Sequence, residues 1–161
     1  MQYTITPSTI LPARTISRQA DFSQAAINEA ATRLRAWALT MGEQIVGLPF
    51  LRIHGQLGCQ VHVPVAGRVS PHPETGISSE TRGETRGVGV RVVRFDEVRP
   101  VVRALSSEIA VDCGLAGPVE YHPASADFSH GTLLWPVHRY SPSLGGTIAV
   151  PGDVRLAEVA S

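Results

Sequence analysis

The sequence contains no lysine, since all fourteen of its cationic residues are arginine. Without a lysine amine the chain cannot form a Schiff base, and it cannot complete a phosphate-binding loop of the Walker type. The arginines are spread along the chain and are balanced by fourteen acidic residues, which gives a formal net charge of zero. We therefore expect no nucleic-acid partner, because a surface for phosphate backbones needs clustered positive charge.

Long hydrophobic runs are also missing. No run approaches the roughly 18 apolar residues that a bilayer-spanning helix needs, so we expect no membrane partner. The opening stretch MQYTITPSTILPARTISR lacks a basic region followed by an apolar core, which predicts that there is no signal peptide. With 43% hydrophobic and 17% charged residues, the composition is typical of a globular protein, and we expect a cytoplasmic one.

Motifs for metal binding and covalent catalysis are absent as well. Cys59 and Cys113 lie far apart, so they are interpreted as small buried hydrophobic residues of a reduced compartment. No histidine pair has the spacing of a ligand set, and no serine elbow or Cys-His-Asn arrangement occurs. We therefore expect neither a metal nor a cofactor. The histidines considered are His54, His62, His122, His130 and His138.

What the chain does contain is two halves with the same order of signals. Each half has a β-branched run, an amphipathic helix that ends at a glycine, and two further strand-like runs. The first helix is expected to begin at a cap on Asp21 and to stop at Gly42, and the second to begin at Asp96 and stop at Gly114. Their apolar faces are Ile27, Ala30, Leu34, Trp37 and Met41, and then Val98, Val102, Leu105, Ile109 and Cys113.

The spacing of three landmarks supports kinship between the halves. The glycine that ends each helix, the next turn glycine and the proline of each Pro-Val pair recur 72, 70 and 72 residues later: Gly42 and Gly114, Gly47 and Gly117, Pro64 and Pro136. A single match of this kind often arises by chance, but the common order of all three favours a true repeat.

The repeat predicts one domain with a definite division. We place repeat one at about 3–66, a flexible linker at 67–87, repeat two at about 88–139 and a tail at 140–161. A short strand is considered at 147–150, and the end of the tail is expected to fray. Two such repeats predict an α+β fold with an antiparallel sheet, both helices on one face and a ligand cleft at the pseudo-symmetric seam.

The turn GLPF at 47–50, the strand ending VHVPV, and their second copies GPVEY and LLWPV resemble the GyrI-like small-molecule-binding family. This family is also called the AraC-type effector-binding or SOUL-like domain, and the resemblance runs from about residue 5 to 139. It implies a cleft between the repeats that binds drug-like, often aromatic and cationic molecules. It also implies a cleft acid on the strand after the second helix, and Glu120 is the matching residue.

Two departures from the family pattern affect the site. Ile53 stands where a tyrosine is usual after the first turn, and GPVEYHP is one residue shorter than usual before its glutamate. A slip of one residue moves a strand side chain to the opposite face. The sequence therefore leaves open whether Glu120 or Tyr121 faces the cleft. No helix-turn-helix region precedes the repeats in this sequence, which argues against interpreting it as a transcription factor.

Glu120 is the candidate catalytic or anchoring residue, and the alternative is a solvent-facing strand glutamate. In an apolar cleft its pKa would be raised unless a cation paired with it. Trp135 either packs under the helices or walls the cleft. The candidate ligand-binding residues are Phe50, His54, Tyr121, Phe128 and Trp135.

Three functions follow from these residues and from the resemblance. The first is a stand-alone protein that binds an amphipathic or aromatic drug-like ligand, for sequestration or self-resistance. The second is a hydrolase in which Glu120 acts on a strained electrophile, since some similar proteins open the cyclopropane of natural products. The third is an inhibitor of DNA gyrase, which rests on one relative, and nothing in the residues themselves supports a protein partner.

Overall fold

The computed structural model of the chain describes residues 2–55, 58–68, 70–71, 73–142 and 147–149. The first five strands are β1 (Gln2–Thr4), β2 (Thr6–Ile10), β3 (Ala13–Ala20), β4 (Phe50–His54) and β5 (Gly58–Pro64). The next five are β6 (Ser78–Arg82), β7 (Thr85–Val92), β8 (Glu120–Pro123), β9 (Gly131–Pro136) and β10 (Thr147–Ala149). The helices are α1 (Gln24–Thr40) and α2 (Val98–Cys113), and two 3-10 turns are η1 (Pro73–Thr75) and η2 (Phe95–Glu97).

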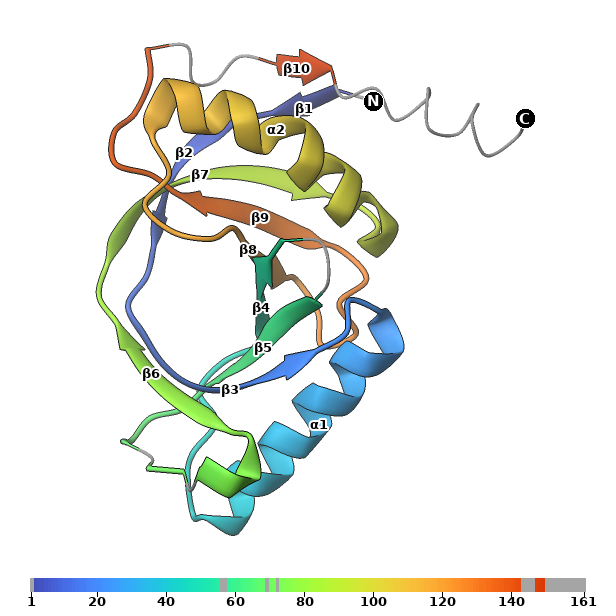
Figure 1. The fold of residues 1–161 in the computed structure, drawn as a ribbon, viewed down its shortest axis with the longest axis vertical. Coiled ribbons are helices and arrows are strands. Elements are labelled where there is room, and N and C mark those ends of the chain that lie inside the picture. The colour runs from blue at the N-terminus through green and yellow to red at the C-terminus, as the bar shows by residue number, and fades with distance from the viewer. Residues whose placement is uncertain (1, 56–57, 69, 72, 143–146, 150–161) are drawn as a thin grey trace, which may run out of the picture.

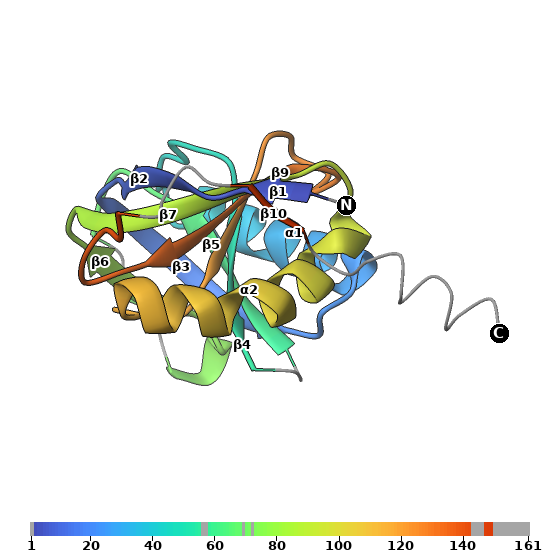
Figure 2. The same cartoon turned by 90° about the horizontal axis from the view of Figure 1, so that it is seen from above.

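Eight strands form one antiparallel sheet in the order β2, β7, β9, β8, β4, β5, β3, β6. Figure 1 shows this sheet curling into a half-barrel, with both helices on its outer face. The core lies between the helices and the sheet, where residues such as Leu34 of α1 and Leu105 of α2 are fully buried. Figure 2 shows β1 and β10 side by side as a separate two-stranded sheet. The predicted α+β class, antiparallel sheet and one-sided helices are confirmed.

The internal repeat is visible in the order of elements. One copy runs β3, α1, β4, β5 and the other runs β7, α2, β8, β9, and the two copies meet where β4 pairs with β8. The landmark residues touch in both copies. A Cβ atom on Gly47 would contact the ring of Pro64, and one on Gly117 would contact the ring of Pro136. The repeated glycine and proline therefore fit together at matching positions of the two copies.

Both helices end as predicted, but they begin differently. Gly42 and Gly114 have φ values of 74° and 71°, the left-handed region that glycine adopts without strain. The cap of α1 is Ser23 rather than Asp21, because the hydroxyl of Ser23 accepts a hydrogen bond from a backbone N–H of the first turn. Asp96 does not cap α2 either, since it lies inside η2, one residue before the cap position.

The segment 67–87, expected as a flexible linker, contains an ordered strand. β6 pairs with β3, and β7 begins at Thr85 and pairs with β2. Ile10 pairs with Thr85 and Ala13 pairs with Arg82, so the register continues across the break between the two ladders. The paired strands β2–β3 and β6–β7 thus form one long ribbon that links both edges of the sheet, and we call it the edge ribbon.

The prediction missed β6 because its sequence, SSETR, has no apolar alternation. β6 is an edge strand whose residues are exposed or half-buried, so no hydrophobic period marks it. Of the predicted tail, β10 confirms the short strand in part, while the expected fraying falls on residues 150–161, outside the described residues. Neither α-helix in the described chain is long and apolar enough to cross a membrane.

Replacing Gly131 by alanine tests the close approach of β8 and β9. A Cβ atom at this position would overlap the carbonyl oxygen of His122, which is backbone and cannot rotate away. We expect Gly131→Ala to lower the free energy of unfolding by about 2 kcal/mol or more, measured by urea denaturation. Gly83→Ala is the control, because nothing lies within 4 Å of its Cβ position, and a change below about 0.5 kcal/mol is expected there. Equal effects of the two substitutions would contradict the β8–β9 packing.

Candidate functional site

The strands at the seam present two different faces. Side chains alternate along a strand, so β4 and β8 each send every second residue toward the helices. Leu51 and Tyr121 pair across the seam on the helix side and are fully buried in the core. Arg52 and Glu120 pair on the opposite, inner face of the curled sheet. Glu120, not Tyr121, therefore lies on the inner face of the sheet.

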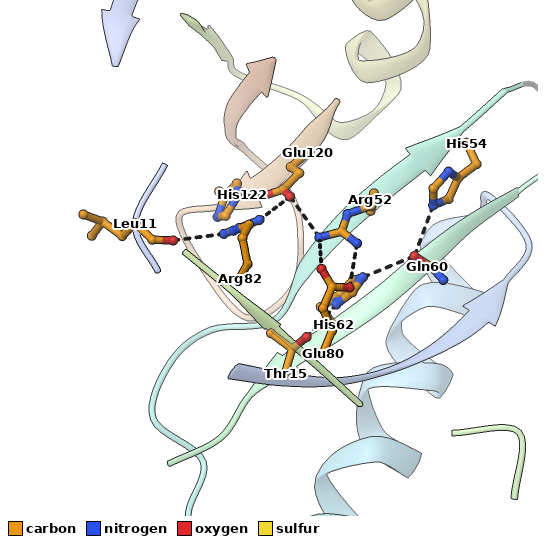
Figure 3. Close-up of polar contacts among 10 residues, drawn as sticks. All are labelled: Leu11, Thr15, Arg52, His54, Gln60, His62, Glu80, Arg82, Glu120 and His122. Carbon is orange, nitrogen blue, oxygen red and sulfur yellow. Dashed lines mark hydrogen bonds and ion pairs between the residues drawn. The ribbon is translucent and has the colours of Figure 1, made fainter. Parts of the chain in front are cut away.

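Glu120 is almost completely buried, with 2% of its surface exposed, and it is paired with three groups (Figure 3). Its Oε2 accepts hydrogen bonds from Arg82 Nη1 and, at 3.3 Å, from Arg52 Nη2. Its Oε1 lies 2.8 Å from His122 Nε2. Arg82 also donates from Nη2 to the carbonyl oxygen of Leu11, at 3.2 Å. One carboxylate thus joins β4, β8 and β6, and Arg82 extends the link to Leu11, between β2 and β3.

These partners determine the direction in which the pKa of Glu120 is shifted. Burial alone would raise the pKa of Glu120, as the sequence led us to expect for an unpaired group. The hydrogen bond with His122 and the charge of Arg82 outweigh burial and lower the pKa to about 2. At neutral pH the side chain is a carboxylate, and it has no proton to give to a ligand.

A second carboxylate completes the cluster. Glu80 of β6 accepts two hydrogen bonds from Arg52, at 2.7 and 2.8 Å, in the parallel geometry that carboxylate and guanidinium favour. Although burial opposes the charged form of Arg52, its bonds to Glu80 and its pairing with Glu120 raise its pKa. The hydrogen bond from Arg52 lowers the pKa of Glu80. Two guanidiniums and two carboxylates therefore balance, and we call Arg52, Glu80, Arg82 and Glu120 the charge cluster.

The ring of Phe50 lies between two imidazoles beside this cluster. Its centroid is 4.9 Å from that of His62 on β5 and 4.7 Å from that of His122 on β8, and all three rings are nearly parallel. Burial and the charge of Arg52 lower the pKa of His62 to about 4, so it is neutral at pH 7. Thr15 holds its Nδ1 at 2.8 Å. The stack gives the inner face a rigid aromatic floor.

A groove of about 690 Å³ lies on the inner face over this floor. Phe50 and His122 line it, and so do Leu48, Leu134 and the apolar part of the edge ribbon. Its charged lining residues are Arg14 and Arg82, and no aspartate or glutamate belongs to the described lining. Glu120 is bonded to Arg82 and His122 but is not itself part of the surface of the groove.

Several of the predicted site residues lie elsewhere. Tyr121, Phe128 and Trp135 are buried on the core side of the sheet. The hydroxyl of Tyr121 donates to the carbonyl oxygen of Phe128, and the indole N–H of Trp135 donates to Ser106 of α2. His54 is exposed at the end of β4, where its Nε2 lies 3.1 Å from Gln60 Oε1. Of the predicted ligand-binding residues, the structure brings only Phe50 to the groove.

The sequence interpretation overlooked the two arginines that pair with Glu120. Arg52 had a usable signal, because it lies two residues after Phe50 on a strand and so shares its face. Arg82 had none, since its segment has the composition of a loop. His122, which the sequence analysis considered only for metal binding, lies on the same face of β8 as Glu120. No group of three residues suited to hold a metal ion occurs among the residues that the structure describes.

Comparison with known proteins gives a likeness in structure only. No protein-family model and no curated protein matches the sequence. The crystal structure of the EcmrR C-terminal domain aligns over 86% of this chain and 99% of that chain, with a TM-score of 0.66 and 12% identity. The fold of this chain is that of the EcmrR C-terminal domain.

A longer chain, EcmrR bound to DNA, contains the same fold. EcmrR in the cryo-EM structure of the EcmrR–DNA complex in EcmrR-RPo aligns with a TM-score of 0.67 and 12% identity, over 86% of this chain. This chain spans 58% of the length of that EcmrR chain. At this identity the likeness concerns the fold alone.

The buried carboxylate makes stability depend on acid pH. The pKa of Glu120 is about 2 in the folded protein and 4.5 for an ordinary glutamate, so its contribution is complete above pH 4.5 and is lost as pH falls toward 2. This linkage is on the order of 3 kcal/mol. We expect Glu120→Gln to be less stable at pH 7 and to lose less stability than the unmodified protein between pH 4.5 and 2.5, measured by urea denaturation.

The matched control is Glu29→Gln, whose carboxylate pairs with Arg33 on the exposed surface of α1. This pair should contribute well under 1 kcal/mol. Parallel pH curves for Glu120→Gln and the unmodified protein would show that the charge cluster does not stabilise the folded state.

Proposed function

We propose that this protein binds an amphipathic or aromatic small molecule in the groove over Phe50. The observation that carries the proposal is the groove itself: about 690 Å³, mostly apolar walls and a few polar groups at defined places. This volume and this composition are those of sites for ligands of drug size. The likeness to the EcmrR C-terminal domain, at the level of fold, supports the same function.

The floor of the groove is ordered before a ligand arrives. The ring of Phe50 is only 4% exposed and is held on both faces by imidazoles, so it loses little conformational entropy when a ligand contacts it. The charge cluster behind it joins β4 and β8 to β6 of the edge ribbon. A preorganised floor of this kind favours binding, because the protein need not reorder when the ligand arrives.

The hydrolase alternative has no specific observation in its favour. A glutamic acid that protonates a strained ring must carry its proton near neutral pH, which requires a raised pKa. Glu120 has a pKa of about 2, and its oxygens are bonded to Arg82, Arg52 and His122. A gyrase-inhibiting function likewise has no residue or surface in the described structure that argues for it.

Binding of the neutral fluorescent probe N-phenyl-1-naphthylamine tests the proposal. We expect saturable binding of about one probe per chain. Leu48→Glu should weaken it by roughly tenfold or more, because this substitution puts a charge on the apolar wall of the groove. The measurement is a fluorescence titration at constant ionic strength.

Leu39→Glu is the matched control, since Leu39 is also an exposed leucine, 68% against 46% for Leu48, but lies on α1 and does not line the groove. Its affinity for the probe should stay within about twofold of the unmodified protein. If the probe does not saturate at one site, or if both variants lose affinity equally, the groove is not the ligand site.

A further inference from the structure

We propose that the protein has a second binding site, separate from the groove, that takes a phosphate group. The site is a polar cavity of about 290 Å³ between β6 and the loop that follows β5. β3 lies beneath it, because β3 pairs with β5 along one edge and with β6 along the other. Two arginines and several hydroxyl side chains line the cavity, among them Arg14, Arg68, Ser79 and Thr81.

The strand register separates these side chains from the charge cluster. Arg14 pairs with Thr81, and the next outward pair along the two strands is Ile16 with Ser79. Ile16 is fully buried in the core that the helices cover, so all four side chains lie on the outer face of the sheet. Alternation turns Glu80, which lies between Ser79 and Thr81, toward the inner face.

The arginine side chains of the cavity have donors to spare. Arg14 Nη1 lies 3.5 Å from the carbonyl oxygen of Ala66, which places this guanidinium beside the loop after β5. Neither Arg14 nor Arg68 forms an ion pair with a described residue. Arg14 is half-buried and Arg68 is exposed, so a ligand in the cavity can reach both. Each guanidinium carries five N–H donors, and the contact with Ala66 uses one of them.

The acids close to the cavity are already bound to other groups. Glu80 is the one acid of the described lining, and its two oxygens accept hydrogen bonds from Arg52 at 2.7 and 2.8 Å. Glu43 reaches the same loop, where its Oε1 accepts the N–H of Gly67 at 2.7 Å, but it does not belong to the lining. The positive charge of the two lining arginines is therefore left for a ligand to balance.

A phosphate group fits this set of donors. Guanidinium forks donate two parallel N–H bonds to phosphate oxygens, and serine and threonine hydroxyls add single bonds. The donors come from β3, β6 and the loop after β5, so they can surround an ion whose oxygens point in several directions. The cavity lies just below the range of about 300–1,000 Å³ for ligands of drug size, which suits inorganic phosphate or a small phosphorylated molecule.

A two-dimensional NMR titration with inorganic phosphate and with glycerol 3-phosphate tests this inference. The titration is run at pH 8, where a phosphate group carries two charges, and sodium chloride keeps the ionic strength constant. We expect saturable shifts of the Gly67, Arg68, Ser79 and Thr81 amides, with a Kd on the order of 1 mM or tighter. Tighter binding of the ester identifies a phosphorylated molecule as the ligand, and equal binding identifies the free ion.

Substitutions in the cavity separate a site from general attraction. Arg14→Gln and Arg68→Gln should each weaken phosphate binding at least about fivefold, because each removes a charged donor. Arg14→Lys should retain part of the affinity, since it keeps the charge and loses the fork. Arg103→Gln is the matched control, because it removes the same charge from an exposed arginine of α2 outside the cavity, and its Kd should stay within about twofold.

Three results would overturn the site. The first is that phosphate shifts the amides of the cavity no more than chloride does. The second is that Arg103→Gln weakens binding as much as Arg14→Gln and Arg68→Gln, which would show attraction to the whole surface. The third is that phosphate displaces N-phenyl-1-naphthylamine, which would put the anion in the groove. Because the probe and phosphate are expected at different places, failure of probe binding concerns the proposed function alone.

Discussion

The buried carboxylate of Glu120 is the interaction on which the arrangement of the inner face depends. An ionised carboxylate at 2% exposure is tolerable only because Arg82, Arg52 and His122 surround it. These partners come from different parts of the chain: β6, β4 and β8. Satisfying one charge therefore fixes the edge ribbon against the seam of the two repeats. The groove has its shape because this ribbon is held in place over the inner face.

The pseudo-symmetry of the fold explains why such a charge sits at the seam. β4 begins at Phe50 and β8 begins at Glu120, and these residues occupy matching places after the turns GLP and GPV. Because the two strands are antiparallel, Arg52 pairs with Glu120, while Phe50 stacks on His122. The backbone is repeated in the two halves, but the side chains at the matching positions differ. One half of the seam is an ion pair and the other is an aromatic stack, which gives the inner face two ends of different polarity.

The sequence was sufficient to predict the repeated part of the fold. Helix faces, glycine stops and strand runs are local signals, and Gly42 and Gly114 act as expected. The edge ribbon could not be predicted, because β6 is polar on both faces and its stability comes from pairing with β3, a contact between distant residues. The contacts of the candidate site could not be predicted for the same reason. Glu120 could be chosen from its place in the repeat, but Arg82 lies in the unpredicted strand, so the sequence could not show that a cation pairs with Glu120 and lowers its pKa.

Burial of the aromatic residues was a separate difficulty. Alternation along β9 shows that Leu133 and Trp135 share one face, but it does not show which face the helices cover. Ser106 of α2 settles this for Trp135, since its hydroxyl accepts the indole N–H at 3.0 Å. The indole and the phenol of Tyr121 thus belong to the packing between sheet and helices. Among the described phenylalanines, tyrosines and tryptophans, Phe50 is the one that lines the groove.

A buried ion pair is a poor source of stability compared with well-packed apolar side chains, because desolvation offsets much of the attraction. Its effect here is to remove a free negative charge from the inner face. Pairing Glu120 with Arg82 and Arg52 takes a negative charge out of reach of solvent, and Arg82, not Glu120, belongs to the lining of the groove. The same fold with an unpaired glutamate at this place would attract cations. Arg82, on a strand with no hydrophobic signal in the sequence, therefore keeps a free carboxylate away from the groove.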